Sequence, residues 1–183
     1  MKKVCVFLAD GFEEIEGLTV VDILRRAGVE TETVSVMGRK QIHGSHDILV
    51  EADKLFEEAD IAAADMLVLP GGMPGTLNLK AHEGLKGQLL AFDSQGKYLA
   101  AICAAPTVLS ELGLLKGKKA CAYPSFEDQL DCGEVLRVPT VTDGNITTGR
   151  GMGAAIPFAL KLTAILCDEE KAEEVKASIV YEG

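Results

Sequence analysis

Apolar runs and helix-spaced apolar residues alternate along the chain. Residues 3–9 form a short, almost uninterrupted apolar run, which is typical of a parallel strand buried on both faces. Residues 14–27 place Ile15, Leu18 and Val21 at helical spacing, and Gly28 supplies a stop. The pattern continues with strands at 31–37, 66–69, 98–102, 119–122, 137–141 and 146–148, a small hairpin at 41–50, and helices at 82–95, 153–167 and 169–178.

This regular alternation of buried strands with amphipathic helices predicts an α/β fold. The sheet should be mostly parallel and doubly wound, with helices on both faces. The connecting segments are short, and no Pro- or Ser-rich linker or internal repeat interrupts them. We therefore expect residues 1–183 to form a single domain.

The most informative position is Cys103, which directly follows the predicted strand at 98–102 and precedes a helical pattern starting near Pro106. A helix N-terminus offers unpaired N–H groups and a partial positive charge, and both stabilise a thiolate. The pKa of a free cysteine, about 8.5, should fall there. The layout is that of a nucleophile elbow with Cys in place of Ser. The alternative is a small buried cysteine that packs like alanine.

Three chemically interesting segments follow predicted strands. They are residues 10–16, the pair Gly71-Gly72, and Cys103. Ligands of doubly wound folds bind at the carboxyl ends of the strands, so this convergence favours a functional Cys103. The N–H groups of Gly72 and Ala104 would form an oxyanion hole, with a plain tight turn as the alternative. The glycine pair matches neither a phosphate loop nor a dinucleotide fingerprint.

Composition narrows the function classes. The chain has 183 residues, 48% of them hydrophobic, and a net charge of −10, which disfavours a nucleic-acid or anionic membrane surface. No apolar stretch approaches the roughly 20 residues that span a bilayer, and the N-terminus is interpreted as a strand, so we expect a cytoplasmic protein. The five cysteines are scattered and share no metal-ligand spacing with the three histidines. Free thiols and no metal are expected.

Three glutamates, Glu13, Glu14 and Glu16, crowd the first turn of the first predicted helix. Acidic residues stabilise that end of a helix on their own account, which explains one or two of them. Glu16 would be the exception if it points at Cys103 and burial keeps its carboxyl partly protonated. The residues alone do not select it.

Five segments together resemble, in order and spacing, the ThiJ/PfpI superfamily, and most closely its DJ-one branch with bacterial members. They are DGFEEIE at 10–16, DILRRAG at 22–28, LVLPGG at 67–72, AAICAAP at 100–106 and GRGMG at 149–153. The resemblance covers essentially the whole chain. It implies a flavodoxin-like sandwich, of the kind also seen in class I glutamine amidotransferase-like domains, and a homodimer.

The resemblance also implies roles and activities. Cys103 becomes the nucleophile, Glu16 the carboxyl hydrogen-bonded to it, and Gly72 and Ala104 the amide donors. The implied activity is a glyoxalase that needs neither glutathione nor another cofactor, or a protein deglycase, acting on methylglyoxal or its early adducts during carbonyl and oxidative stress. The alternative is a redox-sensing chaperone whose cysteine is oxidised to sulfinic acid without turnover.

Two departures from the family pattern qualify these roles. Several members place a histidine near the cysteine where this chain has Tyr123, and a neutral phenol with a pKa near 10 is a poor base. Protease or amidotransferase chemistry is therefore disfavoured, whereas thiol addition to an aldehyde is not. Arg26 matches a position beside the dimer interface, but its partner arginine is replaced by His46. Gly71 and Arg150 are further pocket or interface positions.

Overall fold

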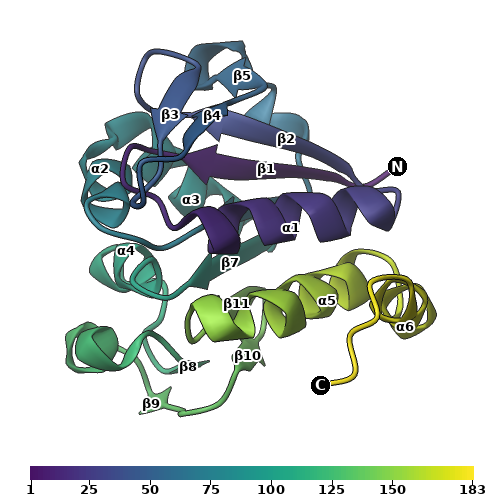
Figure 1. Ribbon diagram of the computed structural model, residues 1–183. Helices are drawn as coiled ribbons and strands as arrows, with labels where there is room; N and C mark the ends of the chain where they lie inside the picture. The colour runs from purple at the N-terminus through teal and green to yellow at the C-terminus, as the bar shows by residue number, and fades with distance from the viewer.

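A computed structural model describes residues 1–183, and its centre is a seven-stranded sheet in the order β10-β11-β7-β6-β1-β2-β5 (Figure 1). Every neighbouring pair is parallel except β10 and β11, which form an antiparallel hairpin at one edge. The strands are β1 (Lys3–Leu8), β2 (Glu30–Ser35), β5 (Lys54–Leu55), β6 (Met66–Leu69), β7 (Tyr98–Ile102), β10 (Thr140–Asp143) and β11 (Ile146–Gly149).

Two small sheets and four single-turn or short 3-10 segments decorate the connections. The small sheets are the antiparallel pair β3 (Gln41–His43) and β4 (Leu49–Glu51) and the parallel pair β8 (Lys119–Ala120) and β9 (Glu134–Val135). The 3-10 segments are η1 (Phe56–Glu58), η2 (Ile61–Ala63), η3 (Pro124–Gln129) and η4 (Met152–Ala154).

Helices cover both faces of the sheet. One face carries α1 (Glu14–Arg26), α5 (Ala155–Leu166) and α6 (Glu169–Ser178), with α1 and α5 packed against each other in Figure 1. The other carries α2 (Gly75–Ala81), α3 (Glu83–Ser94) and α4 (Pro106–Glu111). None of the helices is long and apolar enough to cross a membrane.

Strand β1 shows why its sequence is apolar throughout. Successive side chains of a strand point to opposite faces, so Cys5 and Phe7 join the core on the α3 side, whereas Val4, Val6 and Leu8 join the core on the α1 side. All five are completely buried. A strand in the middle of a doubly covered sheet has no solvent face, and this is the pattern that the sequence predicted.

The predicted fold class is confirmed, with local corrections. Of the predicted strand at 119–122 only Lys119–Ala120 is a strand, and it pairs with β9 outside the main sheet. The predicted strand at 137–141 begins only at Thr140, since Pro139 lacks an N–H group and cannot donate to a ladder. Helix α2 and the short strands β5 and β9 were not predicted.

Candidate active site

Cys103 occupies the sharp turn between β7 and α4. Its φ of 66° lies in the left-handed region, a conformation that costs a residue with a side chain on the order of 1–3 kcal/mol. Two backbone hydrogen bonds hold it there: the Cys103 N–H donates to the carbonyl of Gly149 (3.0 Å), and the N–H of Tyr123 donates to the carbonyl of Cys103 (2.9 Å). The turn leaves the side chain half-buried at the carboxyl end of the sheet.

The first turn of α1 brings Glu16 to this cysteine. The Glu16 side chain is completely buried, and its Oε2 accepts a hydrogen bond from the N–H of Gly71 at 2.9 Å. The carboxyl group also lies beside the Cys103 side chain, and its Oε1 is buried without a hydrogen-bond partner. Glu13 instead caps α1 through the N–H of Ile15, and Glu14 turns away to the β3–β4 loop. Of the three glutamates, the structure brings only Glu16 to the sulfur.

The two glycines after β6 act differently. A Cβ on Gly71 would lie 2.6 Å from the Cys103 Cβ and 2.7 Å from the Glu16 Oε2, so only glycine fits between them. Gly72 has a φ of 92°, and its N–H group, like that of Ala104, lowers the pKa of the Cys103 thiol. Thus Gly71 holds the carboxyl, and Gly72 and Ala104 surround the sulfur with donors.

The pKa values of the pair oppose one sequence-based expectation. Burial raises the pKa of Glu16 to about 7, although the Cys103 thiol and the hydrogen bond from Gly71 lower it. Burial, reinforced by the Glu16 carboxylate, raises the pKa of Cys103 to about 12 against the lowering effect of the two amides. The sequence-based expectation that the pKa of Cys103 falls below its ordinary value is therefore wrong.

The physical reason is that the sequence shows the helix but not the burial. Helix α4 has only six residues, so its dipole is weak, whereas desolvation penalises any charge on the sulfur. Once Glu16 is protonated, its repulsion disappears and its O–H can donate to the sulfur. The pair therefore holds two protons below about pH 7 and one proton, on the sulfur, above it.

Two predicted residues lie beside the elbow, in a separate cavity. Tyr123 and Arg150 both line a cavity of about 490 Å³. A Cβ on Gly151 would meet the Tyr123 ring at 3.3 Å, so the ring packs against the chain that follows Arg150. Neither side chain is hydrogen-bonded to Cys103 or Glu16.

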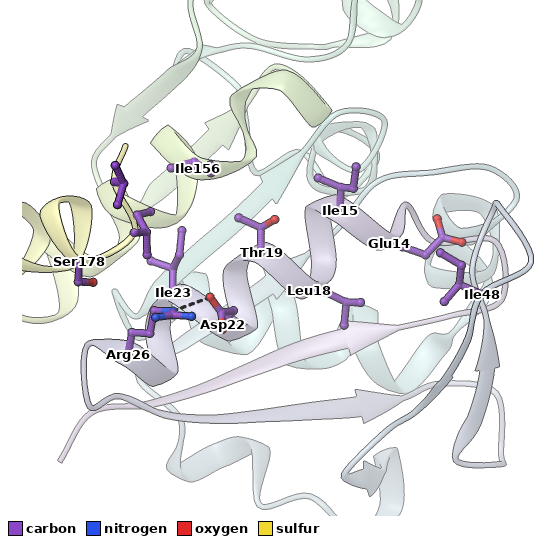
Figure 2. A pocket seen from close by; sticks show the side chains of 12 residues that line it. Glu14, Ile15, Leu18, Thr19, Asp22, Ile23, Arg26, Ile48, Ile156 and Ser178 are labelled. Atoms are coloured by element: carbon purple, nitrogen blue, oxygen red, sulfur yellow. Dashed lines mark hydrogen bonds and ion pairs between the residues drawn. The ribbon is translucent and has the colours of Figure 1, made fainter. Parts of the chain in front are cut away.

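The other two predicted residues, Arg26 and His46, do not reach the cysteine. Arg26 pairs with Asp22 at 2.7 Å in a groove along α1, as Figure 2 shows. His46 Nδ1 lies 2.9 Å from Glu14 Oε2, and this hydrogen bond raises the pKa of His46. Burial alone would raise the pKa of Glu14, but hydrogen bonds from His46 and Ser45 help to lower it to about 2. A charged His46 is therefore neutralised by its own neighbour.

The same cluster is the only group of side chains with a metal-ligand arrangement. Donor atoms of Glu13, Glu14 and His46 lie within 4.8 Å of one another. However, Glu14 already accepts from the His46 backbone N–H at 2.7 Å and from Ser45 Oγ at 3.2 Å. These bonds account for the arrangement as a clamp between α1 and the β3–β4 loop, and the absence of a metal stays a prediction.

Sequence reasoning missed two residues, Glu127 and Arg137. The carboxyl of Glu127 is buried in η3, and it accepts a hydrogen bond from Arg137 Nε at 3.0 Å. Arg150 lies on its other side, at 3.5 Å. No periodicity or motif marks these positions, because they come from a short 3-10 segment and a loop. The only feature of the sequence that could have suggested the pair is the opposite charge of Glu127 and Arg137, ten residues apart.

The fold and the site define a class: flavodoxin-like α/β proteins with a cysteine on a strand–helix elbow and a buried carboxyl beside it. The profile of the DJ-1/PfpI family matches residues 2–165, so the chain belongs to this family. The resemblance seen in the sequence is thereby confirmed.

Individual relatives agree. Protein dj-1beta of Drosophila melanogaster is 38% identical over 182 residues, 98% of this chain and 97% of that protein. Glutathione-independent glyoxalase DJ-1 of Schizosaccharomyces pombe is 31% identical over 189 residues, 98% of each. Protein DJ-1 homolog A of Arabidopsis thaliana is 36% identical, and this chain spans 46% of its length. The structure of oxidised Toxoplasma gondii DJ-1 superposes with a TM-score of 0.93 at 38% identity, covering 100% of both chains.

Substituting Gly71→Ala should destabilise the protein, because the new Cβ has to displace Cys103, Glu16 or the Ile102 carbonyl. We expect a loss of about 1–3 kcal/mol in the free energy of unfolding, measured by urea titration. Gly87 in α3 is the matched control, since a Cβ there meets nothing within 4 Å. Gly87→Ala should be neutral or stabilising by up to about 1 kcal/mol. Equal effects of the two substitutions would contradict the close approach.

The raised pKa of Glu16 should appear as a pH-dependent stability. Between pH 4.5 and about 7 the folded protein holds a proton that the unfolded chain releases, so Glu16 makes stability fall as the pH rises. Over the full window the loss is about 3 kcal/mol. Glu16→Gln does not titrate, so its free energy of unfolding relative to wild type should increase from pH 5.5 to pH 8. A difference that stays constant over this range would contradict the raised pKa.

Proposed function

We propose that this protein is a cofactor-free, cysteine-dependent glyoxalase or protein deglycase that acts on methylglyoxal or its early adducts. The observation that carries the proposal is the placement of Cys103 and a buried Glu16, whose pKa is about 7, on either side of Gly71. A general base is most effective when its pKa lies near the working pH. The name of the fission yeast relative, glutathione-independent glyoxalase, supports the same chemistry.

In the first step, the Cys103 sulfur adds to the aldehyde carbon of methylglyoxal. Ionised Glu16 accepts the thiol proton as the S–C bond forms, so no free thiolate has to accumulate despite its pKa of about 12. The aldehyde oxygen gains the negative charge and is stabilised by the N–H groups of Gly72 and Ala104. Glu16 then returns its proton to that oxygen, which yields a hemithioacetal and leaves Glu16 ionised for the next step.

In the second step, Glu16 moves a proton between neighbouring carbons. It takes the proton from the former aldehyde carbon to give an enediol, and a proton is returned to the adjacent carbon. The product is a lactoyl thioester on Cys103. Water then hydrolyses the thioester, which releases lactate and regenerates the thiol. The sum is methylglyoxal plus water giving lactate and a proton, with no external oxidant or reductant.

Lactate formation from methylglyoxal by the purified protein tests this proposal. Cys103→Ser should abolish it, and Glu16→Gln should lower kcat by about 10²–10⁴-fold. The activity of wild type should rise with pH through about 7, as Glu16 ionises. Cys167→Ser is the matched control, because Cys167 is the exposed free cysteine, and it should keep full activity. Unchanged lactate formation by Cys103→Ser would refute the proposal.

Redox sensing is a second candidate, and the carboxyl group beside Cys103 favours this thiol for it. Cys5 and Cys121 are buried, Cys103 and Cys132 are half-buried, and Cys167 is exposed. Glu16 could hydrogen-bond the oxygens of a sulfinic acid. The activity assay separates the two candidates when it is paired with intact mass after mild peroxide. A selective gain of two oxygens on Cys103 in a protein without turnover would favour sensing.

We also propose that the protein is a homodimer, with α1 at its two-fold interface. A groove of about 660 Å³ runs along this helix and is bordered by α5 and the C-terminal end of α6 (Figure 2). Its apolar side chains are unusually exposed: Ile15 by 49%, Ile48 by 51% and Val180 by 80%. Covering such a patch with a second copy would remove it from water.

Light scattering at micromolar concentration should therefore give twice the monomer mass of 19.4 kDa. Leu18→Glu places a charge in the groove and should yield monomers. Leu90→Glu is the matched control, since Leu90 is similarly exposed but lies on α3, on the opposite face of the sheet. Circular dichroism verifies that both variants are folded. A monomeric wild type would reject the interface.

A further inference from the structure

A second cavity lies beside the nucleophile and has no role in the chemistry above. Its volume is about 490 Å³, and its walls come from the segment before β10, the end of β11 and the start of α5. Two guanidinium groups, Arg137 and Arg150, line it together with the rings of Tyr123 and Tyr181 and several prolines. We call it the diarginine pocket.

The charged groups at the diarginine pocket sum to a net positive charge. Arg137 and Arg150 share a single counter-ion, the buried carboxyl of Glu127, and no carboxylate is among the residues that line the cavity. One positive charge is left over, on a chain whose net charge is −10. Arg150 Nε is buried without a hydrogen-bond partner, and the Arg137 side chain is 75% exposed and pairs with Glu127 through its Nε. These groups can therefore bind an anion.

The diarginine pocket is tied to the nucleophile through the backbone. Cys103 donates to the carbonyl of Gly149, the residue before Arg150, and accepts from the N–H of Tyr123. Both residues that fix the elbow thus lead directly into the pocket wall. Neither Cys103 nor Glu16 is among the residues that line the cavity, so a ligand in it leaves the catalytic pair uncovered.

We propose that the diarginine pocket binds the carboxylate of an organic monoanion with an apolar body. The residual charge of one matches a carboxylate better than a phosphate dianion, and guanidinium groups bind carboxylates through paired hydrogen bonds. Pro139, Pro157 and the tyrosine rings supply apolar walls. Such a ligand, if it carries an aldehyde, would direct it toward Cys103; this second statement depends on the proposed function.

Binding is tested without turnover, using benzoate as the probe and neutral benzyl alcohol as its matched control. Calorimetric titration of Cys103→Ser should show benzoate binding, with benzyl alcohol at least tenfold weaker. Arg137→Gln, made in the same background, should weaken benzoate binding about tenfold or more, and Arg137→Lys should restore part of it. Because Arg137 also pairs with the buried Glu127, circular dichroism verifies that both Arg137 variants are folded.

Lys86→Gln removes the same charge from α3, outside the pocket, and should leave benzoate binding unchanged. Equal binding of benzoate and benzyl alcohol would overturn the proposal. Benzoate binding that is insensitive to Arg137→Gln would overturn it as well.

The orienting role is tested with 4-carboxyphenylglyoxal and phenylglyoxal, which differ by one carboxylate. In wild type kcat/KM should be about tenfold higher for the anionic aldehyde, and the ratio should approach one in Arg137→Gln. Equal values in wild type would overturn the orienting role. If methylglyoxal and both aldehydes are inert, the proposed function fails and the orienting role fails with it, and benzoate binding alone then decides the pocket.

Discussion

The site depends on one constraint: a carboxyl and a thiol are buried side by side, and both cannot carry a charge there. Burial raises the pKa of Glu16 to about 7 and that of Cys103 to about 12. The pair therefore holds either two protons or one near neutral pH. When one proton remains, it lies on the sulfur, so an ionised carboxylate stands beside a thiol, and the surrounding backbone keeps the two groups close together.

The sheet order explains how three distant segments meet. Strands β7, β6 and β1 are neighbours, and their carboxyl ends lead to Cys103, to Gly71 and, through the start of α1, to Glu16. All three strands run parallel, so their ends lie at the same edge. The absence of a side chain at Gly71 sets how close the other two groups approach.

Much of this arrangement could be predicted from the sequence, but not its electrostatics. Strands that are buried on both faces are apolar at every position, so the apolar runs alone predicted β1, β6 and β7. They also predicted that Cys103 follows a strand. Selecting Glu16 from three neighbouring glutamates needed the family resemblance, because orientation within one helical turn depends on packing. The predicted lowering of the Cys103 pKa was wrong because a sequence shows that a helix follows the cysteine but not how far the thiol is buried. No motif or periodicity in the sequence marked Glu127 as a buried carboxyl group.

Charge distribution links the two cavities around the elbow. The chain is strongly acidic, so an anionic molecule is repelled from most of its surface. Near Cys103 this repulsion is reduced twice: Glu16 is half neutral at pH 7, and Glu127 is outnumbered by Arg137 and Arg150. A neutral aldehyde needs only the half-neutral Glu16. The excess of arginine over Glu127 would matter only for an anionic ligand. The diarginine pocket, and not Cys103 with Glu16, would therefore decide between neutral and anionic aldehydes.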